Sequence, residues 1–171
     1  MLGSANIGVR ERKMQIFIMR HGQASYDCES DAMRPLTGQG KLEATLMAGW
    51  MMKMDFVPDR VWVSPYKRAQ QTCQQVFEKL NYKRASETLN IITPSGVANE
   101  VHDFIDGDLA VNPCQKLLIV SHMPLVSFLV GELTHQQQSP IFQTAGVCEI
   151  EYDLSSMNGS ITRMVAPIDL C

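Results

Sequence analysis

Short apolar runs alternate with longer segments of helical period along this chain, and this alternation restricts the possible folds more than any other feature. The runs that have the length of strands lie at 15–19, 60–63, 89–92 and 116–120. Segments with helical spacing of apolar residues lie at 38–54, 66–80, 97–109 and 124–133. Such alternation is typical of α/β domains, in which helices cover a largely parallel sheet. We therefore expect a three-layer α/β/α sandwich.

The C-terminal part of the sequence indicates an antiparallel edge. Two further strand candidates, at 147–154 and 161–165, flank Asn158-Gly159, a dipeptide that favours a tight hairpin turn. The sequence contains no repeat, no second domain and no large cap insertion. We expect residues 14–171 to form a single domain. Residues 1–13 lack the apolar core of a secretory signal, and we expect a flexible extension or a start assigned too early, with Met14 as the natural alternative.

The helical segments carry recognisable end signals and inner faces. Thr37 is a plausible N-cap for the first helix, and Pro124 suits the first turn of the fourth, where its missing N–H costs nothing. The spacing of apolar residues predicts that the first helix turns one set of residues inward and the second helix another. These sets are Leu42, Leu46, Gly49 and Trp50, and then Ala69, Cys73, Val76 and Leu80.

Composition excludes several classes of protein. With 171 residues, 45% of them hydrophobic, the chain can bury one full core. A net charge of −3 argues against a broad basic surface for nucleic acid, and no apolar stretch is long enough for a membrane span. The five cysteines are scattered and form no Cys-x-x-Cys pair, so neither a disulfide framework nor a zinc site is indicated. We expect a reduced, cytoplasmic monomer.

Basic residues and histidines follow the predicted strands. Arg20 and His21 end the first strand, Arg68 opens the helix after the second, and His122 follows the run at 116–120. The carboxyl ends of parallel strands meet at one edge of a sheet, which is where α/β proteins bind ligands. Two guanidinium groups there match the oxygens of a phosphoryl group. An imidazole in this cationic field stays neutral, and it is then available as a nucleophile on phosphorus.

Four motifs carry a resemblance to a known family. In chain order they are Arg20-His21-Gly22, Leu36-Thr37-x-x-Gly40-x-x-Glu43-Ala44, Ser64-Pro65-x-x-Arg68-Ala69-x-x-Thr72 and Ser121-His122. This set resembles the histidine phosphatase superfamily, which also contains the cofactor-dependent phosphoglycerate mutases. Within it the chain is similar to the small SixA-type phosphohistidine phosphatases. The local strings that support this are Arg34-Pro35-Leu36-Thr37, Thr93-Pro94-x-Gly96 and Ser121-His122-x-Pro124.

The resemblance implies a role for each residue. His21 attacks the phosphoryl group and becomes phosphohistidine, which water then hydrolyses. Arg20 and Arg68 hold the phosphoryl oxygens and offset the charge that develops in the transition state. His122 is a further donor, together with the backbone N–H of Met123. The resemblance implies no metal and no cofactor.

One departure from the family pattern bears on the substrate. Many members carry a glutamate general acid near the end of the third strand, but the segment 89–94 contains no carboxylate. An alkoxide leaves poorly without an acid, whereas imidazole, with a pKa of about 6.5, leaves far more easily. The hypothesis is a site suited to P–N cleavage. Glu100, Asp103 or Asp106 could still supply an acid from the following segment.

The short chain also bears on the partner. It has little sequence for a lid, which favours a bulky substrate over a small metabolite. The expected partner is the histidine phosphotransfer domain of a two-component signalling relay, a step that rests on the resemblance. The alternatives are a small-molecule phosphomonoesterase of the same superfamily and a non-catalytic phosphoprotein-binding module.

Overall fold

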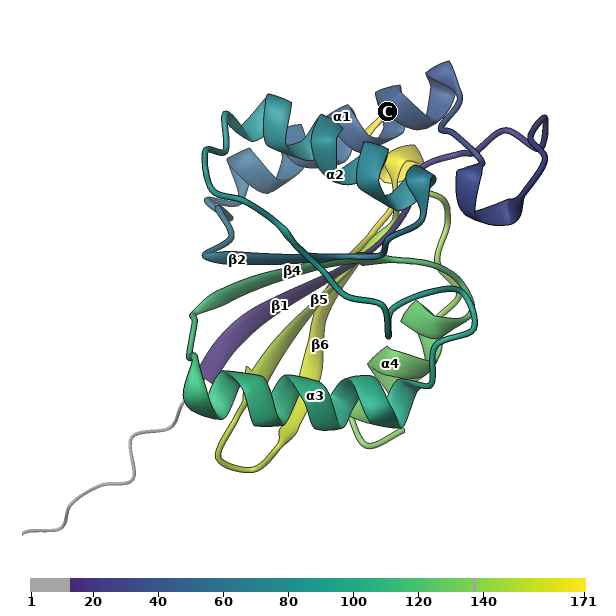
Figure 1. Ribbon diagram of the computed structural model, residues 1–171. Coiled ribbons are helices and arrows are strands. Elements are labelled where there is room, and N and C mark those ends of the chain that lie inside the picture. The colour runs from purple at the N-terminus through teal and green to yellow at the C-terminus, as the bar shows by residue number, and fades with distance from the viewer. Residues whose placement is uncertain (1–12, 137) are drawn as a thin grey trace, which may run out of the picture.

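The computed structural model describes residues 13–136 and 138–171. Within these residues a six-stranded sheet lies between two layers of helices (Figure 1). The strands are β1 (Lys13–Arg20), β2 (Arg60–Val63), β3 (Glu87–Thr88), β4 (Lys116–Ser121), β5 (Val147–Asp153) and β6 (Asn158–Val165). The α-helices are α1 (Gly38–Lys53), α2 (Lys67–Leu80), α3 (Ala98–Val111) and α4 (Leu125–Leu133). The three-layer prediction is confirmed.

The sheet is parallel on one side and antiparallel on the other. Its order is β3-β2-β4-β1-β5-β6, and the first four of these strands pair in parallel. β5 pairs antiparallel with β1 and β6 antiparallel with β5, which confirms the predicted antiparallel edge. Most of the predicted extension, residues 1–12, lies outside the described residues, whereas Lys13 opens β1.

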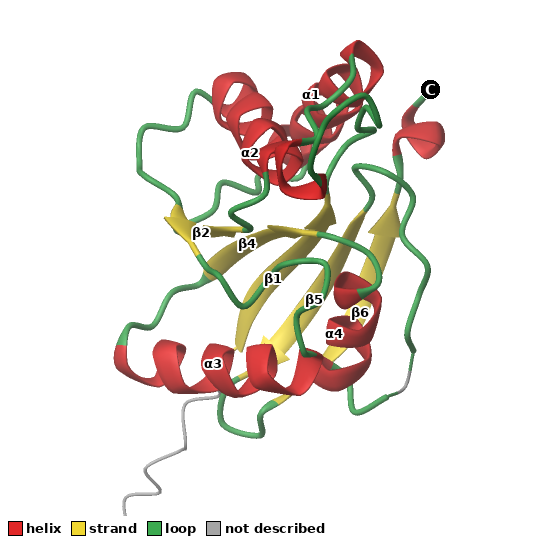
Figure 2. Ribbon diagram, turned by 45° about the vertical axis from the view of Figure 1, so that its right-hand side comes forward, coloured by secondary structure: helices red, strands yellow, loops and turns green. Residues whose placement is uncertain are grey.

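The two helical layers follow from the alternation of side chains along the strands. On β1, Phe17 and Met19 face the core beneath α1 and α2, whereas Ile16 and Ile18 face the core beneath α3 and α4. Figure 2 shows α1 and α2 together on one face of the sheet and α3 and α4 on the other. A strand buried on both faces reads as a continuous apolar run. Among the described residues, no helix is both long and apolar enough to cross a membrane.

The inner face of α1 differs from the prediction. Leu42 and Leu46 are 67% and 37% exposed, and Gly49 and Trp50 are only partly buried. The buried residues of the helix are instead Gly40, Ala44, Met47, Ala48 and Met51. Three of these are small, and their four-residue spacing places them on one side of the helix, where they allow close packing. Side-chain hydrophobicity alone therefore misplaced the face. The Thr37 cap is confirmed, because its Oγ1 accepts from the N–H of Gly40 at 3.0 Å.

The predicted strand at 89–92 is wrong. The structure places a two-residue strand, β3, just before it, and the last ladder bond is donated by the N–H of Leu89 to the carbonyl of Val63 at 3.0 Å. The chain then turns, and Ile92 is completely buried in the core beneath α3 and α4. The apolar run reflects the packing of an irregular segment rather than sheet pairing.

The C-terminal hairpin turns earlier than predicted. Asn158 and Gly159 lie inside β6, and the turn is formed by residues 154–157. The Asp153 carboxylate accepts from the N–H of Ser155 at 2.8 Å, which stabilises this turn. A Cβ at Gly159 would meet the side chain of Ile150 at 2.7 Å. This glycine therefore serves a close approach of β6 to β5 and not a tight turn.

The topology of the sheet changes direction between β1 and β4. β1 and β4 are adjacent and parallel, but α1 and α4, which follow them, cover opposite faces (Figure 1). The place where helices diverge from neighbouring parallel strands is a switch point, and the carboxyl ends of the strands at such a point are the usual ligand site of these sheets. The N–H of His21 donates to the carbonyl of Ser121 at 3.0 Å, so the pairing of β1 with β4 continues up to His21.

Candidate active site

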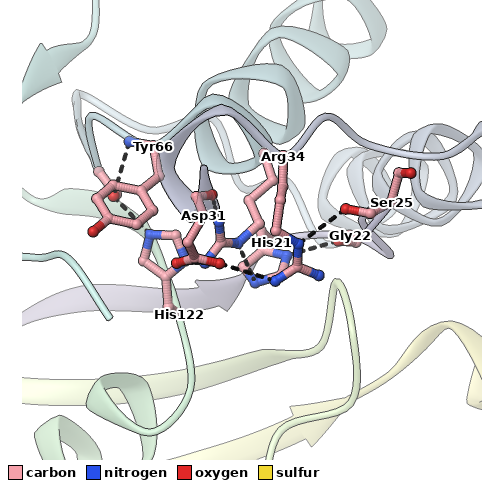
Figure 3. Close-up of polar contacts among 9 residues, drawn as sticks. His21, Gly22, Ser25, Asp31, Arg34, Tyr66 and His122 are labelled. Atoms are coloured by element: carbon pink, nitrogen blue, oxygen red, sulfur yellow. Dashed lines mark hydrogen bonds and ion pairs between the residues drawn. The ribbon is translucent and has the colours of Figure 1, made fainter. Parts of the chain in front are cut away.

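The structure brings the two predicted site histidines together. His21 follows β1 and His122 follows β4, and their ring centroids are 5.1 Å apart (Figure 3). His21 is 7% exposed and His122 only 1%. Arg68 is the second residue of α2 and is also buried, and its Nε donates to Nε2 of His21 at 3.3 Å. These three residues form the centre of the site.

The tautomer of His21 follows from its partners. Nδ1 lies 2.7 Å from the carbonyl oxygen of Gly22, which can only accept, so Nδ1 carries the proton. Nε2 accepts from Arg68 and therefore presents its lone pair. Burial lowers the pKa of His21 to about 4, and the positive charges of Arg68, Arg20 and Arg34 add to this, outweighing the Gly22 hydrogen bond, which raises it. His21 is neutral at pH 7, with an unprotonated Nε2 whose lone pair faces Nε of Arg68.

The loop that carries His21 is held by α2 and α1. The N–H of Gly22 donates to Oγ1 of Thr72 at 3.0 Å, and the Thr72 hydroxyl donates to the carbonyl of Arg68 at 2.8 Å. A Cβ at Gly22 would overlap the backbone of Gly40, so the start of α1 lies directly against this loop. Gln23, next along, donates its N–H to the Glu43 carboxylate at 2.9 Å. The motif residues thus fix the backbone beneath the imidazole.

The carboxylate of Asp31 forms ion pairs with two arginines of the site, Arg34 and Arg68. The Asp31 Oδ2 lies 3.1 Å from Nη2 of Arg68, and its Oδ1 lies 3.1 Å from Nη1 of Arg34 (Figure 3). Arg68 also donates through Nη1 to the backbone carbonyl of Asp31 at 2.6 Å. Partial burial raises the pKa of Asp31, but hydrogen bonds from Arg34 and Arg68 outweigh this and lower it. Asp31 is therefore an anion that bridges the two guanidinium groups.

Arg20 is the last residue of β1 and directly precedes His21. Its Nη1 donates to the carbonyl of Phe142 at 2.8 Å, and its Nε is buried with no hydrogen-bond partner among the described residues. Burial lowers the pKa of Arg20, and Arg68 lowers it further against the opposing effects of Tyr26 and Glu43. A buried donor without a partner is rare in native proteins and points to a ligand that completes it.

One ring nitrogen of His122, Nδ1, also lacks a hydrogen-bond partner among the described residues. Its Nε2 lies 2.6 Å from Oγ of Ser64, and its ring meets that of Tyr66 edge-on at 5.2 Å. Burial lowers the pKa of His122 to about 3, with further lowering by His21 and Arg68. Nδ1 is buried and has no partner in the described part of the chain. Met123, whose N–H was the remaining predicted donor, is the next residue and is partly buried.

Sequence reasoning missed three residues of this site. Arg34 stands in a motif string that supports the family resemblance, but the sequence alone indicates no role for it. Ser64 begins another motif, and the sequence alone indicates no role for it either. Asp31 had no signal at all, because it lies in an exposed 3₁₀ turn (Asp31–Met33) between β1 and α1. Only the folded loop reveals that its carboxylate reaches Arg68.

The candidate acids of α3 do not form part of the described contacts of His21 or His122. Asp106 accepts from the hydroxyl of Tyr152 at 2.5 Å and lies 3.2 Å from Nε2 of His102. Glu100 and Asp103 are exposed. Within the described residues, no group of three or more His, Cys, Asp and Glu side chains is arranged to hold a metal ion, and the five cysteines are free thiols.

Comparison with known proteins agrees with this chemistry. The family model of the histidine phosphatase superfamily, branch 1, matches residues 16–93. The phosphohistidine phosphatase SixA of Escherichia coli K12 is 38% identical over 157 residues, which cover 92% of this chain and 96% of that protein. A SixA homologue of Haemophilus influenzae is 37% identical over 147 residues, covering 82% of this chain and 89% of that protein.

Solved structures show the same fold. The protein histidine phosphatase SixA in complex with tungstate superimposes with a TM-score of 0.88 at 38% identity, covering 92% of this chain and all of that one. A mycobacterial glucosyl-3-phosphoglycerate phosphatase, at 13% identity and a TM-score of 0.70 over 88% of this chain and 98% of that one, shares the fold alone. SixA is 38% identical to this chain over nearly the full length of both proteins. This chain is therefore a hydrolase that belongs to the histidine phosphatase superfamily.

Proposed function

We propose that this chain is a protein phosphohistidine phosphatase that hydrolyses N-phosphohistidine on a histidine phosphotransfer domain. The observation that carries the proposal is the state of His21, a neutral imidazole with its proton held by Gly22 and its Nε2 lone pair beside Arg68. Such a group is a nucleophile for phosphorus. The relatives named phosphohistidine phosphatase supply the substrate class.

In the first step, Nε2 of His21 attacks the phosphorus atom and the P–N bond of the substrate breaks. The phosphoryl oxygens take the place of the Asp31 carboxylate on Arg68 and Arg34, while Nε of Arg20 supplies a further donor. These cationic groups offset the negative charge of the transition state. The leaving imidazole, protonated on its other ring nitrogen, departs as a neutral ring.

In the second step, water attacks the phosphorus atom of the phosphohistidine, and the bond to Nε2 of His21 breaks. The proton on Nδ1 stays on the ring, held by the carbonyl of Gly22 at 2.7 Å. His21 therefore leaves as neutral imidazole, and the protons of the water end on phosphate and solvent. The Gly22 carbonyl thus serves both steps, because it fixes the proton opposite the reacting nitrogen.

The absence of a carboxylate from residues 89–94 supports an imidazole leaving group over an alkoxide. The three carboxylates considered as replacements do not strengthen the case for an ester substrate, since Asp106 is bound to Tyr152 and the other two are exposed. Asp31 is ionised by its arginine partners and is poorly suited to donate a proton. P–N cleavage needs the least help from an acid.

The exposed surface beside the site supports a macromolecular substrate. Tyr26 and Met33 are 86% and 55% exposed and belong to the loop that also carries Asp31. The guanidinium of Arg34 stacks on the Tyr26 ring at 4.0 Å from its centroid. Exposed tyrosine, methionine and arginine side chains are enriched where proteins contact other proteins. A phosphorylated domain could contact these side chains while its phosphohistidine enters the site.

The test is phosphate release from a phosphorylated histidine phosphotransfer domain, measured beside a panel of small phosphate esters. We expect rapid release from the phosphohistidine alone, abolished in His21→Ala and retained in His135→Ala, which removes an exposed histidine outside the site. Faster turnover of an ester than of the phosphohistidine would instead make the protein a small-molecule phosphomonoesterase. Binding without turnover of any substrate would make it a phosphoprotein-binding module.

A further inference from the structure

Ser64 is held against the ring of His122 by the register of the sheet. It follows the last residue of β2, and Val63 of β2 pairs with Val120 of β4. The N–H of Ser64 donates to the carbonyl of Val120 at 3.1 Å, which extends this pairing by one bond. The side chain is completely buried, and its Oγ lies 2.6 Å from Nε2 of His122. The hydroxyl therefore has a fixed position.

The hydrogen bonds of this hydroxyl decide which way its own hydrogen points. Oγ lies 3.3 Å from the backbone nitrogen of Tyr66, and an amide N–H can only donate (Figure 3). Among the described residues, the remaining partner of Oγ is Nε2 of His122. The hydroxyl hydrogen has this one acceptor, so Ser64 donates to Nε2 and accepts from Tyr66. Nε2 then carries a lone pair.

A neutral imidazole has one ring proton, and here it must lie on Nδ1. Burial together with His21 and Arg68 keeps His122 neutral at pH 7, because its pKa falls to about 3. Nδ1 is a buried nitrogen with no partner in the described part of the chain. The opposite tautomer would leave the serine hydrogen buried without an acceptor, which native proteins avoid. It would leave Nδ1 unpaired as well, whereas the tautomer protonated on Nδ1 leaves only that nitrogen without a partner among the described residues.

We propose that Ser64 is a positioning residue that keeps the proton of His122 on Nδ1, so that His122 offers an N–H donor to the phosphoryl oxygens. The ring of His122 lies 5.1 Å from that of His21, whose Nε2 forms the bond to phosphorus. The consequence for catalysis rests on the proposed function, whereas the tautomer is a property of the free protein. Ser64 acts through His122 and does not touch the substrate.

The direct test is the tautomer of His122 in protein labelled with ¹⁵N-histidine, read from two-bond ¹H–¹⁵N correlations at pH 7.5. His122→Gln assigns the signals. We expect a protonated Nδ1 and an unprotonated Nε2 in the wild type, retained in Ser64→Thr and lost or mixed in Ser64→Ala. Ser121→Ala is the matched control, because it removes a buried hydroxyl that donates to Ile92 and not to His122. A wild-type His122 protonated on Nε2 overturns the proposal.

A kinetic cycle separates positioning from a general structural effect. Loss of one hydrogen-bond donor to a developing anion lowers kcat by about 100-fold. We expect Ser64→Ala to lower kcat by up to this factor. Ser64→Thr, which keeps the hydroxyl, should retain most of the wild-type kcat. In a His122→Ala background, Ser64→Ala should cause no further loss. A further loss of the same size there would contradict the proposal. If the wild type releases no phosphate from phosphohistidine, the proposed function fails, but the NMR result still decides the tautomer.

Discussion

Asp31 occupies two guanidinium groups that the proposed chemistry needs for a phosphoryl group. Its carboxylate lies 3.1 Å from both Arg34 and Arg68, so a phosphoryl group must displace it. We predict that Asp31→Asn binds inorganic tungstate more tightly than the wild type, by roughly tenfold, since about 1.4 kcal/mol of competing attraction corresponds to that factor. Titration calorimetry measures this affinity directly.

The matched control for Asp31→Asn is Asp27→Asn. Asp27 lies in the same exposed loop, and its substitution changes the net charge equally, so we expect little change in tungstate affinity. If Asp31→Asn weakens tungstate binding instead, Asp31 organises the arginines rather than competes for them.

The sequence could not show the contact of Asp31 with the two arginines, because it depends on the conformation of a loop. The placement of His21 and His122 was predictable, because parallel strands bring their carboxyl ends to one edge.

The start of α1 packs directly against the loop that carries His21. A Cβ at Gly40 would overlap the backbone oxygen of Gln23, whereas a Cβ at Gly38 would meet nothing within 4 Å. We predict that Gly40→Ala lowers the free energy of unfolding by about 1–3 kcal/mol, as overpacking does. It should also lower kcat, because the loop beneath His21 moves. Urea denaturation and phosphate release measure the two effects.

Gly38→Ala is the control in the same helical turn. It should stabilise the protein by about 0.4–1 kcal/mol through the unfolded state and leave kcat unchanged. Equal effects of the two substitutions would contradict this account of the packing. The sequence predicted the existence of α1 and its Thr37 cap, but not its buried face. The small residues Gly40, Ala44 and Ala48 allow α1 to pack closely on its neighbours. A pattern of hydrophobic side chains does not reveal this kind of packing.

At the scale of the whole molecule, burying two neutral histidines makes the stability depend on pH. The pKa values of His21 and His122 fall to about 4 and about 3 in the folded protein, from an unfolded value of about 6.5. Below that unfolded value the unfolded chain takes up protons that the folded chain does not. We therefore predict that stability, complete above pH 6.5, falls as the pH is lowered toward 4, by up to about 1.4 kcal/mol per pH unit for each histidine.

Urea denaturation at pH 7.5 and pH 5.0 measures this dependence. His122→Gln should lose less stability on acidification than the wild type, because it removes one of the two sites. His135→Gln should behave as the wild type, since His135 is exposed. An equal loss in all three proteins would contradict the burial of a neutral His122. The sequence predicted a neutral imidazole from the surrounding arginines, but the dominant cause, burial, required the folded structure.

The architecture could be predicted from the alternation of apolar runs and helical segments, but element boundaries could not. The run at 89–92 is apolar because Ile92 fills the core, and Gly159 is a glycine because β5 lies close to it. In the sequence, the run at 89–92 cannot be distinguished from a strand, and Asn158-Gly159 cannot be distinguished from a hairpin turn. The candidate site lies beside elements whose signals were strong, and for this reason the sequence placed His21, Arg68 and His122 at one edge of the sheet, where the structure brings them together.

The most direct test of the account is to locate the phosphoryl group on the enzyme during turnover. The protein is mixed with a phosphohistidine-bearing phosphotransfer domain, quenched in alkali within milliseconds and mapped by mass spectrometry. We expect an alkali-stable, acid-labile phosphoryl group on His21 that appears and decays with phosphate release and is absent from His21→Ala. Phosphate release at an undiminished rate with no label on His21, or with label on another side chain, would contradict it.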